Sequence, residues 1–275
     1  MNKLTDNDYR LPYIEALRPA ETLLEGTTAP MGIWGSDRET GERGAYVVKF
    51  VKSERMSPRS CSFELLGAWM AREVGLFAPK PNVVHISREF VEQTLKGRDG
   101  YKAAYQSIGF NYGSVYEVGY SSVPASVIDE TDDLFEQVKM LYAFDLFIAN
   151  TDRGHKKPNV ATDGEQLLVF DHELAFSFIH ILPMLRNKTP WIFDDTDTET
   201  YRGHHFYSAL RNKELDFSEQ VEKLTCFDAA FWEKAFSLIP DEWKNEALTD
   251  VRNHLTSILQ NKGVFAQTIS KTLLQ

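Results

Sequence analysis

The stretch of the chain from residue 144 to residue 178 combines apolar runs with polar side chains at their edges, and it restricts the fold more than any other stretch. It reads FDLFIANTDRGHKKPNVATDGEQLLVFDHELAFSF. Asp152 follows an apolar run of helix length, and Asp171 follows the short apolar run 167–170, which is typical of a buried strand. Asn159 lies between the two carboxylates. Because an unpaired carboxylate is costly to bury, the fold must bury both runs and leave these polar side chains facing solvent, a cation or a cleft.

Two carboxylates and an amide in this arrangement suit the chemistry of a metal-bound phosphate. Hard Mg²⁺ prefers oxygen ligands such as those of Asn159 and Asp171. Transfer of a phosphoryl group also needs a carboxylate near the attacking hydroxyl, and Asp152 is the candidate for that role. The alternatives are structural. Asp152 would then be a turn residue or a helix cap, where Asn, Thr and Asp are common, and Asp171 would be part of an acidic turn without an ion.

The first part of the chain contains a candidate for the lysine that phosphoryl transfer requires. Lys49 lies inside the β-branched and aromatic run 45–51, and Val48 and Phe50 are expected on the opposite face of that strand. Glu64, at the start of the next predicted helix, is the natural partner that would orient Lys49. The alternative is that Lys49 belongs to the exposed face of an ordinary strand, as most single lysines in strands do.

A short polar loop of Gly26, Thr27 and Thr28 precedes the first predicted strand, and it could present amides and hydroxyls to phosphates. The loop matches neither GxxxxGKS nor GxGxxG, and a simple turn is the alternative. The sequence contains no GxSxG and no HExxH motif, so it gives no support to a hydrolase or a metalloprotease.

We expect the first part of the chain, residues 1–108, to be rich in strands. Apolar residues at helical spacing predict one helix over 61–74, with Ser60 as its N-cap, and another that ends near Pro19. The predicted strands are 31–34, 45–51, 83–86 and 101–108, of which the first two form a hairpin.

The second part, residues 109–275, is expected to be mainly helical. It begins with a connector over 109–127 that is rich in Gly, Ser and Tyr, and the acidic run 194–199 is expected to be a solvated loop. Helices are predicted over 132–149, 228–239 and 243–260. A strand-rich part followed by a helix-rich part predicts an α+β fold of two lobes with a cleft between them.

The composition excludes several kinds of partner. Its 30 basic and 40 acidic residues give a net charge of −10, whereas nucleic acids and anionic membranes require a positive surface. The two cysteines, Cys61 and Cys226, form neither a disulfide framework nor a zinc motif. No window has the apolar character of a signal peptide or a membrane span. We therefore expect a cytoplasmic protein that binds neither nucleic acid nor membrane.

Together these motifs resemble those of the HipA-like kinases, bacterial Ser/Thr kinases of which several are toxins of toxin–antitoxin pairs. The resemblance runs from about Gly26 to the C-terminal helices. Phosphatidylinositol kinases have a related pattern, but His172 and Glu173 after Asp171 favour the HipA-like kinases. The motifs that carry the resemblance are GTTAP at 26–30, YVVKF at 46–50, NTDR at 150–153 with Asn159, and VFDH at 169–172.

The resemblance implies a two-lobed, protein-kinase-like fold with ATP in the cleft and Mg²⁺ as the metal. Asp152 would be the catalytic base or would orient the attacking hydroxyl, and Asn159 and Asp171 would hold Mg²⁺. Lys49, oriented by Glu64, would contact the ATP phosphates. The step from Asp152 to Asn159 is 159 − 152 = 7 residues, longer than the step of about five in kinases with the HRDxxxxN motif.

The same resemblance implies that Gly26, Thr27 and Thr28 form the loop over the phosphates. Thr27 and Thr28, with Thr22 close by, would be the hydroxyls available for autophosphorylation. The implied partners are a protein substrate and a small DNA-binding protein of the antitoxin type. The alternatives are a kinase that acts on a small molecule or a lipid, and a pseudokinase that binds nucleotide without turnover.

Overall fold

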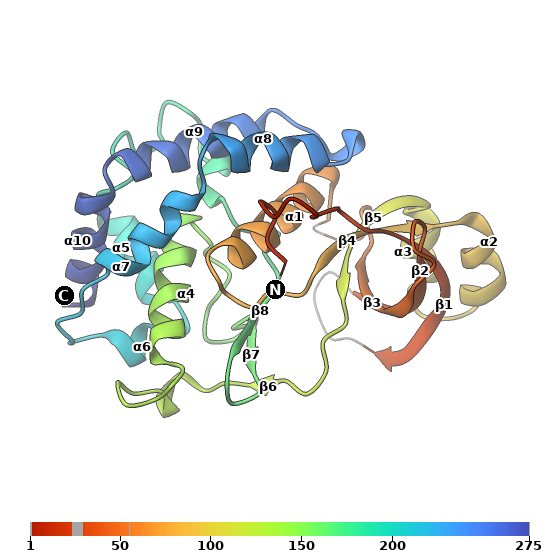
Figure 1. Cartoon of the computed structure of the whole chain (residues 1–275), viewed down its shortest axis with the longest axis horizontal. Helices are drawn as coiled ribbons and strands as arrows, with labels where there is room; N and C mark the ends of the chain where they lie inside the picture. Colours follow the sequence, from red (N-terminus) through yellow and green to blue (C-terminus); the bar gives the residue numbers. More distant parts are fainter. Residues whose placement is uncertain (1, 24–29, 55, 275) are drawn as a thin grey trace.

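The computed structural model describes residues 2–23, 30–54 and 56–274, and its N-terminal part forms a closed five-stranded barrel (Figure 1). The strands pair in the order β1, β2, β3, β5, β4. Neighbouring strands are antiparallel except β1 and β4, whose parallel pairing closes the barrel. The strands are β1 (Tyr13–Leu23), β2 (Met31–Asp37), β3 (Arg43–Lys49), β4 (Pro81–Ile86) and β5 (Gly109–Val115).

The predicted hairpin of β2 and β3 is confirmed, with Met31 opposite Val48 and Ser36 opposite Arg43. Side chains alternate across β3 as its sequence predicts. Val48 is in the buried core of the barrel, whereas Lys49 lines a cleft outside it. The alternation therefore turns the one lysine of β3 towards the rest of the protein.

The helix predicted to end near Pro19 is wrong, because residues 13–23 form β1. Exposure in this segment alternates with the period of a strand: Ile14 and Ala16 are buried, and Leu17 is 43% exposed. Pairing with β2 on one side and β4 on the other fixes the extended backbone. These tertiary contacts outweigh the helical spacing of the apolar residues.

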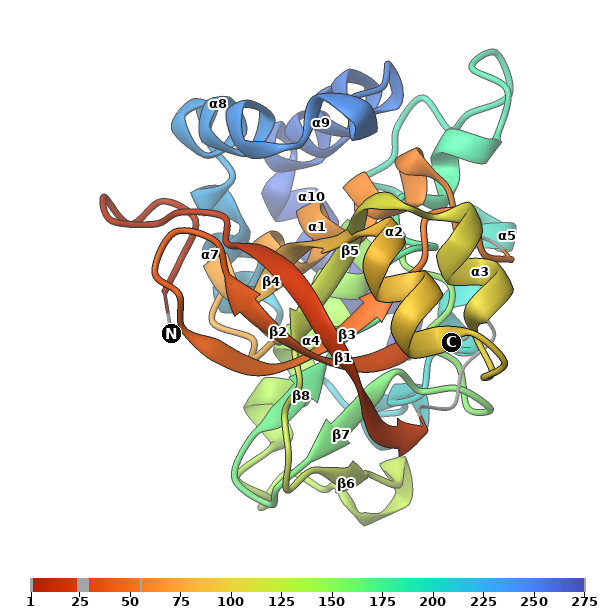
Figure 2. The ribbon, with the colours of Figure 1, turned by 90° about the vertical axis from the view of Figure 1, so that its right-hand side faces the viewer.

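The strand predicted over 101–108 is also wrong, because this segment contains helix α3 (Tyr101–Gln106). It follows helix α2 (Arg88–Phe90) and a π-helical turn (Val91–Leu95). Helices α2 and α3 lie at the end of the molecule far from the C-terminus (Figure 1), the end that faces the viewer in Figure 2. Ala104 and Phe90 contribute to the barrel core. In the same helix Tyr101 packs against the barrel core, and Tyr105 is 44% exposed.

The connector predicted over 109–127 is wrong in its first part, since β5 lies between β3 and β4. Gly113 allows the strands to pack closely here. A Cβ added to Gly113 would lie 2.4 Å from Val84 Cγ2, so the neighbouring strand β4 can approach only a residue without a side chain.

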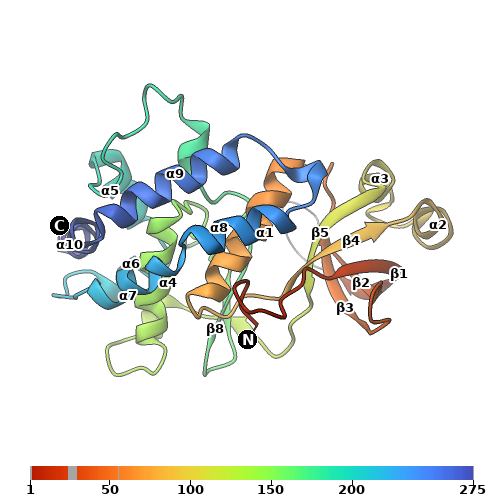
Figure 3. The ribbon, with the colours of Figure 1, turned by 45° about the horizontal axis from the view of Figure 1, so that its top comes forward.

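Helix α1 (Pro58–Glu73) lies between the barrel and the helical part (Figure 3). Its residues from Cys61 onwards are all buried, which shows that other elements pack around the whole helix. The helix begins before the predicted start. Ser57, and not Ser60, is the N-cap: Ser57 Oγ accepts a hydrogen bond from Ser60 N at 3.1 Å, and Pro58 occupies the first turn.

The second half is mainly helical, as predicted. The helices expected over 132–149, 228–239 and 243–260 correspond to α4, α8 and α9, although α9 begins at Ala247. The acidic run is part of helix α5, which starts with a capping box between Asp194 and Asp197, and so the predicted loop is wrong. The helices are α4 (Phe135–Phe147), α5 (Asp195–Arg202), α6 (Tyr207–Leu210), α7 (Ser218–Lys223), α8 (Ala229–Leu238), α9 (Ala247–Gln260) and α10 (Lys262–Leu273).

Three short strands, β6 (Ser121–Ser122), β7 (Val160–Thr162) and β8 (Leu167–Val169), form a small sheet in this half. Strand β8 is the short buried strand predicted ahead of Asp171. None of the helices in the described ranges combines the length and the apolar character that crossing a membrane requires.

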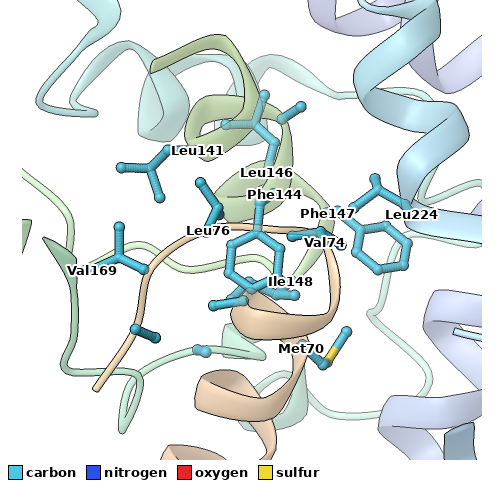
Figure 4. Close-up of a cluster of buried hydrophobic side chains, with 14 of the residues drawn as sticks. Met70, Val74, Leu76, Leu141, Phe144, Leu146, Phe147, Ile148, Val169 and Leu224 are labelled. Atoms are coloured by element: carbon cyan, nitrogen blue, oxygen red, sulfur yellow. The ribbon is translucent and has the colours of Figure 1, made fainter. Parts of the chain in front are cut away.

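One hydrophobic core joins α1 to the helical part (Figure 4). Met70 of α1 and Val74, the C-cap of that helix, lie in it with Phe144 and Phe147 of α4 and with Val169 of β8. Helix α4 is buried on all sides over its last turns, since every residue from Met140 to Phe147 is buried. This core fixes the two apolar runs that flank Asp152 and Asp171.

Truncation in this core should destabilise the whole helical part. Phe144 is fully buried, so Phe144→Ala is expected to lower the free energy of unfolding by about 3–5 kcal/mol, through lost burial and the cavity left behind. Val264→Ala, at a position 43% exposed on α10, is the control and should change it by less than about 0.5 kcal/mol. Equilibrium urea unfolding measures both, and a loss below about 1 kcal/mol for Phe144→Ala would contradict this description of the core.

Candidate functional site

Lys49, at the end of β3, meets three carboxylates from two other segments. Its Nζ contacts Glu64 of α1, lies 2.6 Å from Asp171 Oδ1 and lies 3.4 Å from Glu173 Oε2. Burial alone would lower the pKa of Lys49, but the three carboxylates outweigh it and raise that pKa well above its usual value. The ammonium group is therefore charged and held in a fixed position, and the structure brings together the predicted residues Lys49, Glu64 and Asp171.

Glu64 connects strand β3 to the segment after β8. One carboxylate oxygen contacts Lys49, and the other accepts a hydrogen bond from the backbone N–H of His172 at 3.0 Å. Burial raises the pKa of Glu64 to about 7, although Lys49 opposes the shift. Both oxygens of Glu64 are thus committed to partners within the protein.

A second buried network fixes the polar loop that contains Asp152. Asp145, on α4, is contacted by the guanidinium of Arg153, accepts a hydrogen bond from Asn150 Nδ2 at 2.9 Å and pairs with His204 Nε2 at 3.0 Å. Burial alone would raise the pKa of Asp145, but Arg153 and His204 outweigh it and lower that pKa to about 2. Asp145 is not among the residues singled out from sequence, and its signal there is a lone carboxylate within the apolar run 140–149.

Arg153 extends this network to the next part of the loop. Its Nη1 donates to the backbone carbonyls of Asn159, of Pro158 at 3.3 Å and of Phe170 at 3.4 Å. The guanidinium has only donors to offer, in a fixed planar arrangement, and here several carbonyl groups accept from it. Arg153 therefore holds Asn159 and the end of β8 at fixed positions relative to α4.

Asn159 and Asp171 lie at the open end of the hairpin formed by β7 and β8. Val160 pairs with Val169, and Phe170 N donates to the carbonyl of Asn159 at 3.2 Å. Asn159 Nδ2 also donates to Asp152 Oδ2 at 3.2 Å, so the structure brings these two predicted residues together. The long step between them contains a tight turn with a β-bridge from Gly154 to Lys157.

The backbone is strained where these side chains project. Asn159 and Asp171 have φ values of 47° and 64°, in the left-handed region that few residues other than glycine adopt. Ala149 and Phe176, which flank the stretch, also have positive φ values. Such strain concentrates at functional sites, where the surrounding structure over-determines the backbone.

A cleft of about 450 Å³ lies against these residues, and both halves of the protein line it. Its volume is in the range of sites that bind small ligands. Lys49, Glu64, Asn159 and Asp171 lie on its polar side. Apolar and aromatic side chains form much of the rest, among them Val47, Ala78, Tyr112, Tyr116, Val160, Leu168 and Phe170. Sequence reasoning did not identify these wall residues, since they come from five separate segments.

The predicted phosphate loop, Gly26, Thr27 and Thr28, lies outside the described residues. Pro30, shortly after it in the chain, lines the cleft.

Beside the cleft, three carboxylates bring oxygen atoms close enough together to hold one metal ion. Oxygen atoms of Glu64, Asp171 and Glu173 all lie within 4.8 Å of one another. When ionised, the three carboxylates exceed the charge of Lys49 by 3 − 1 = 2, which is the charge of one Mg²⁺ ion. Oxygen atoms are the ligands that Mg²⁺ prefers, so the oxygen donors and the excess negative charge of this cluster both fit Mg²⁺.

A five-stranded barrel, a helical second part and a lysine–carboxylate cluster beside the cleft are consistent with a kinase-like fold. The family model for HipA-like kinases matches residues 39–268, and the chain belongs to this family. Membership implies a kinase, that is, a phosphotransferase that uses ATP. A search of curated proteins found no significant match.

The Asp145 network makes stability depend on pH in the acid range. The pKa of Asp145 falls from 3.8 to about 2 on folding. The contribution of Asp145 to the free energy of unfolding is therefore complete above pH 3.8 and is lost as the pH falls towards 2.

Asp145→Asn should destabilise the protein at pH 7 by about 3–5 kcal/mol, because Arg153 loses its buried partner. The difference between wild type and variant should shrink by about 2 kcal/mol as the pH falls from 5 towards 2. Urea unfolding across this range measures it, and a constant difference would show that Asp145 is not ionised in the way described.

Proposed function

We propose that the protein is a Ser/Thr protein kinase that transfers the γ-phosphoryl group of ATP to a protein hydroxyl with the help of Mg²⁺. The observation that carries the proposal is the meeting of Lys49, Glu64 and Asp171 at one end of the cleft, next to the hydrogen-bonded pair of Asp152 and Asn159. Phosphoryl transfer depends on positioning and charge neutralisation, and this set offers a residue for each task.

Lys49 and Glu64 serve the nucleotide. The Lys49 ammonium contacts the ATP phosphates, and Glu64 orients it through their buried contact. Asp171 and Asn159 would hold Mg²⁺, which neutralises charge on the phosphate oxygens when it is bound. The apolar walls of the cleft, in particular Val47, Ala78 and Phe170, suit the flat, largely apolar faces of adenine.

Asp152 serves the acceptor. The oxygen of the substrate hydroxyl forms a bond to the γ-phosphorus, and the bond from that phosphorus to the bridging oxygen of ADP breaks. The hydroxyl proton passes to the Asp152 carboxylate, which acts as the base or orients the hydroxyl for attack. The hydrogen bond from Asn159 Nδ2 holds that carboxylate beside the proposed metal ligands.

Two substitutions separate these roles. Asp171→Asn should lower phosphate transfer at least about 1,000-fold, because charge neutralisation at the phosphates is lost. Asp152→Asn should lower kcat by about 100- to 10,000-fold and leave nucleotide affinity within about threefold of wild type, since it removes a group that acts on the acceptor. Asp8→Asn, at an exposed position, is the control and should retain full activity.

The assay is transfer of labelled phosphate from Mg-ATP to a cell lysate, with nucleotide affinity measured in parallel by calorimetry. Label in protein, lost in both variants, supports the proposal. Label in lipid or in small molecules alone would replace it with the corresponding kinase activity. Wild-type protein that neither binds ATP nor transfers phosphate with any divalent metal would overturn it. Intact mass of the wild type after incubation with Mg-ATP tests autophosphorylation, for which Thr27 and Thr28 remain our candidates.

A further inference from the structure

Glu173 is a buried carboxylate to which the roles proposed above assign no task. Its side chain is 3% exposed, and it lies two residues after Asp171. Among the described residues its hydrogen-bond partner is Lys49, with Oε2 at 3.4 Å from Nζ. That distance is at the outer limit of a hydrogen bond. A carboxylate buried with so little compensation is costly, which suggests a second state in which it is better paired.

Lys49 has three N–H donors, and three carboxylates surround them. Glu64 is tied to both Lys49 and the backbone of His172 and is poorly placed to change partners. Asp171 is the partner that must change. In the proposed function Asp171 holds Mg²⁺, whereas in the described structure it accepts a hydrogen bond from Lys49 at 2.6 Å.

Lys49 and a metal ion therefore compete for the same carboxylate. A metal binds Asp171 more tightly when the ammonium group moves away from it, because two cations repel each other at short range. Glu173 Oε2 already lies 3.4 Å from the ammonium nitrogen, farther than Asp171 Oδ1 at 2.6 Å. A small shift of Lys49 towards Glu173 would shorten that contact and leave Asp171 to the metal.

We propose that Glu173 is a positioning residue that draws Lys49 off Asp171 and so frees Asp171 for the metal. The proposal rests on the proposed function, in which Asp171 is a metal ligand. A competing role is direct coordination, since an oxygen of Glu173 lies within 4.8 Å of oxygens of Glu64 and Asp171.

The test is the affinity for Mn²⁺ in the presence of a non-hydrolysable ATP analogue, followed by electron paramagnetic resonance. Glu173→Gln keeps the shape of the side chain and removes its charge, so Lys49 should stay on Asp171 and Mn²⁺ affinity should fall by about three- to tenfold. The same substitution made in Lys49→Met protein should change the affinity less than about twofold, because no ammonium group is left to position. Glu165→Gln, in the exposed turn between β7 and β8, is the matched control and should behave as wild type.

Two results would overturn the proposal. One is an unchanged Mn²⁺ affinity in Glu173→Gln. The other is an equal loss in the Lys49→Met background, which would make Glu173 a metal ligand or a simple source of negative charge. Thermal unfolding of each variant checks its folding, and Glu173→Asp, which keeps the charge, should bind Mn²⁺ more tightly than Glu173→Gln even if both are less stable.

A kinetic measurement adds a second readout. In Glu173→Gln the Mg²⁺ concentration that gives half-maximal activity should rise by about three- to tenfold, as the Mn²⁺ affinity falls. The kcat at saturating Mg²⁺ should stay within about twofold of wild type. A purely structural role would lower kcat at all Mg²⁺ concentrations and so contradict the proposal. Wild-type protein that binds no metal–nucleotide complex would instead count against the proposed function, so the two failures can be told apart.

Discussion

The buried contact between Lys49 and Glu64 is the interaction on which the organisation of the cleft depends. It joins the end of β3 to α1, and the second oxygen of Glu64 joins α1 to the segment that carries Asp171. A barrel strand, a helix buried on all sides and the end of a small sheet are thereby fixed around one point. Buried ion pairs rarely stabilise a fold more than apolar residues of the same size would, so their presence here points to function.

The two buried ionic networks have opposite characters. Around Asp145, a guanidinium, an imidazole and an amide saturate one carboxylate, and the pKa of that carboxyl is lowered to about 2. Around Lys49, carboxylates outnumber cations, and burial raises the pKa of both Glu64 and Glu173. The first network is complete within the protein and holds the loop in place. The second lacks positive charge, as expected of a site that receives a cation together with a nucleotide.

Local patterns in the sequence were sufficient for the elements that carry the site. The β2–β3 hairpin, α1, α4 and β8 were predicted because each has a clear period or a continuous apolar run. The prediction failed where pairing between strands decides the structure. The apolar residues of β1 have helical spacing, but pairing with β2 and β4 makes the segment a strand. In β5, Gly113 permits close contact with β4. Glu173 and the walls of the cleft could not be found in this way, since their roles arise from contacts between segments far apart in the chain.

Anomalous X-ray scattering can show whether a metal–nucleotide complex binds where Lys49, Asn159 and Asp171 meet. Crystals grown with Mn²⁺ and a non-hydrolysable ATP analogue should show a manganese peak within about 2.5 Å of an oxygen of Asp171 and of Asn159, a distance typical of hard cations with oxygen ligands. The phosphates should lie against Lys49, and the adenine between Val47 and Phe170. A manganese peak elsewhere, or a nucleotide outside this cleft, would contradict binding at this site.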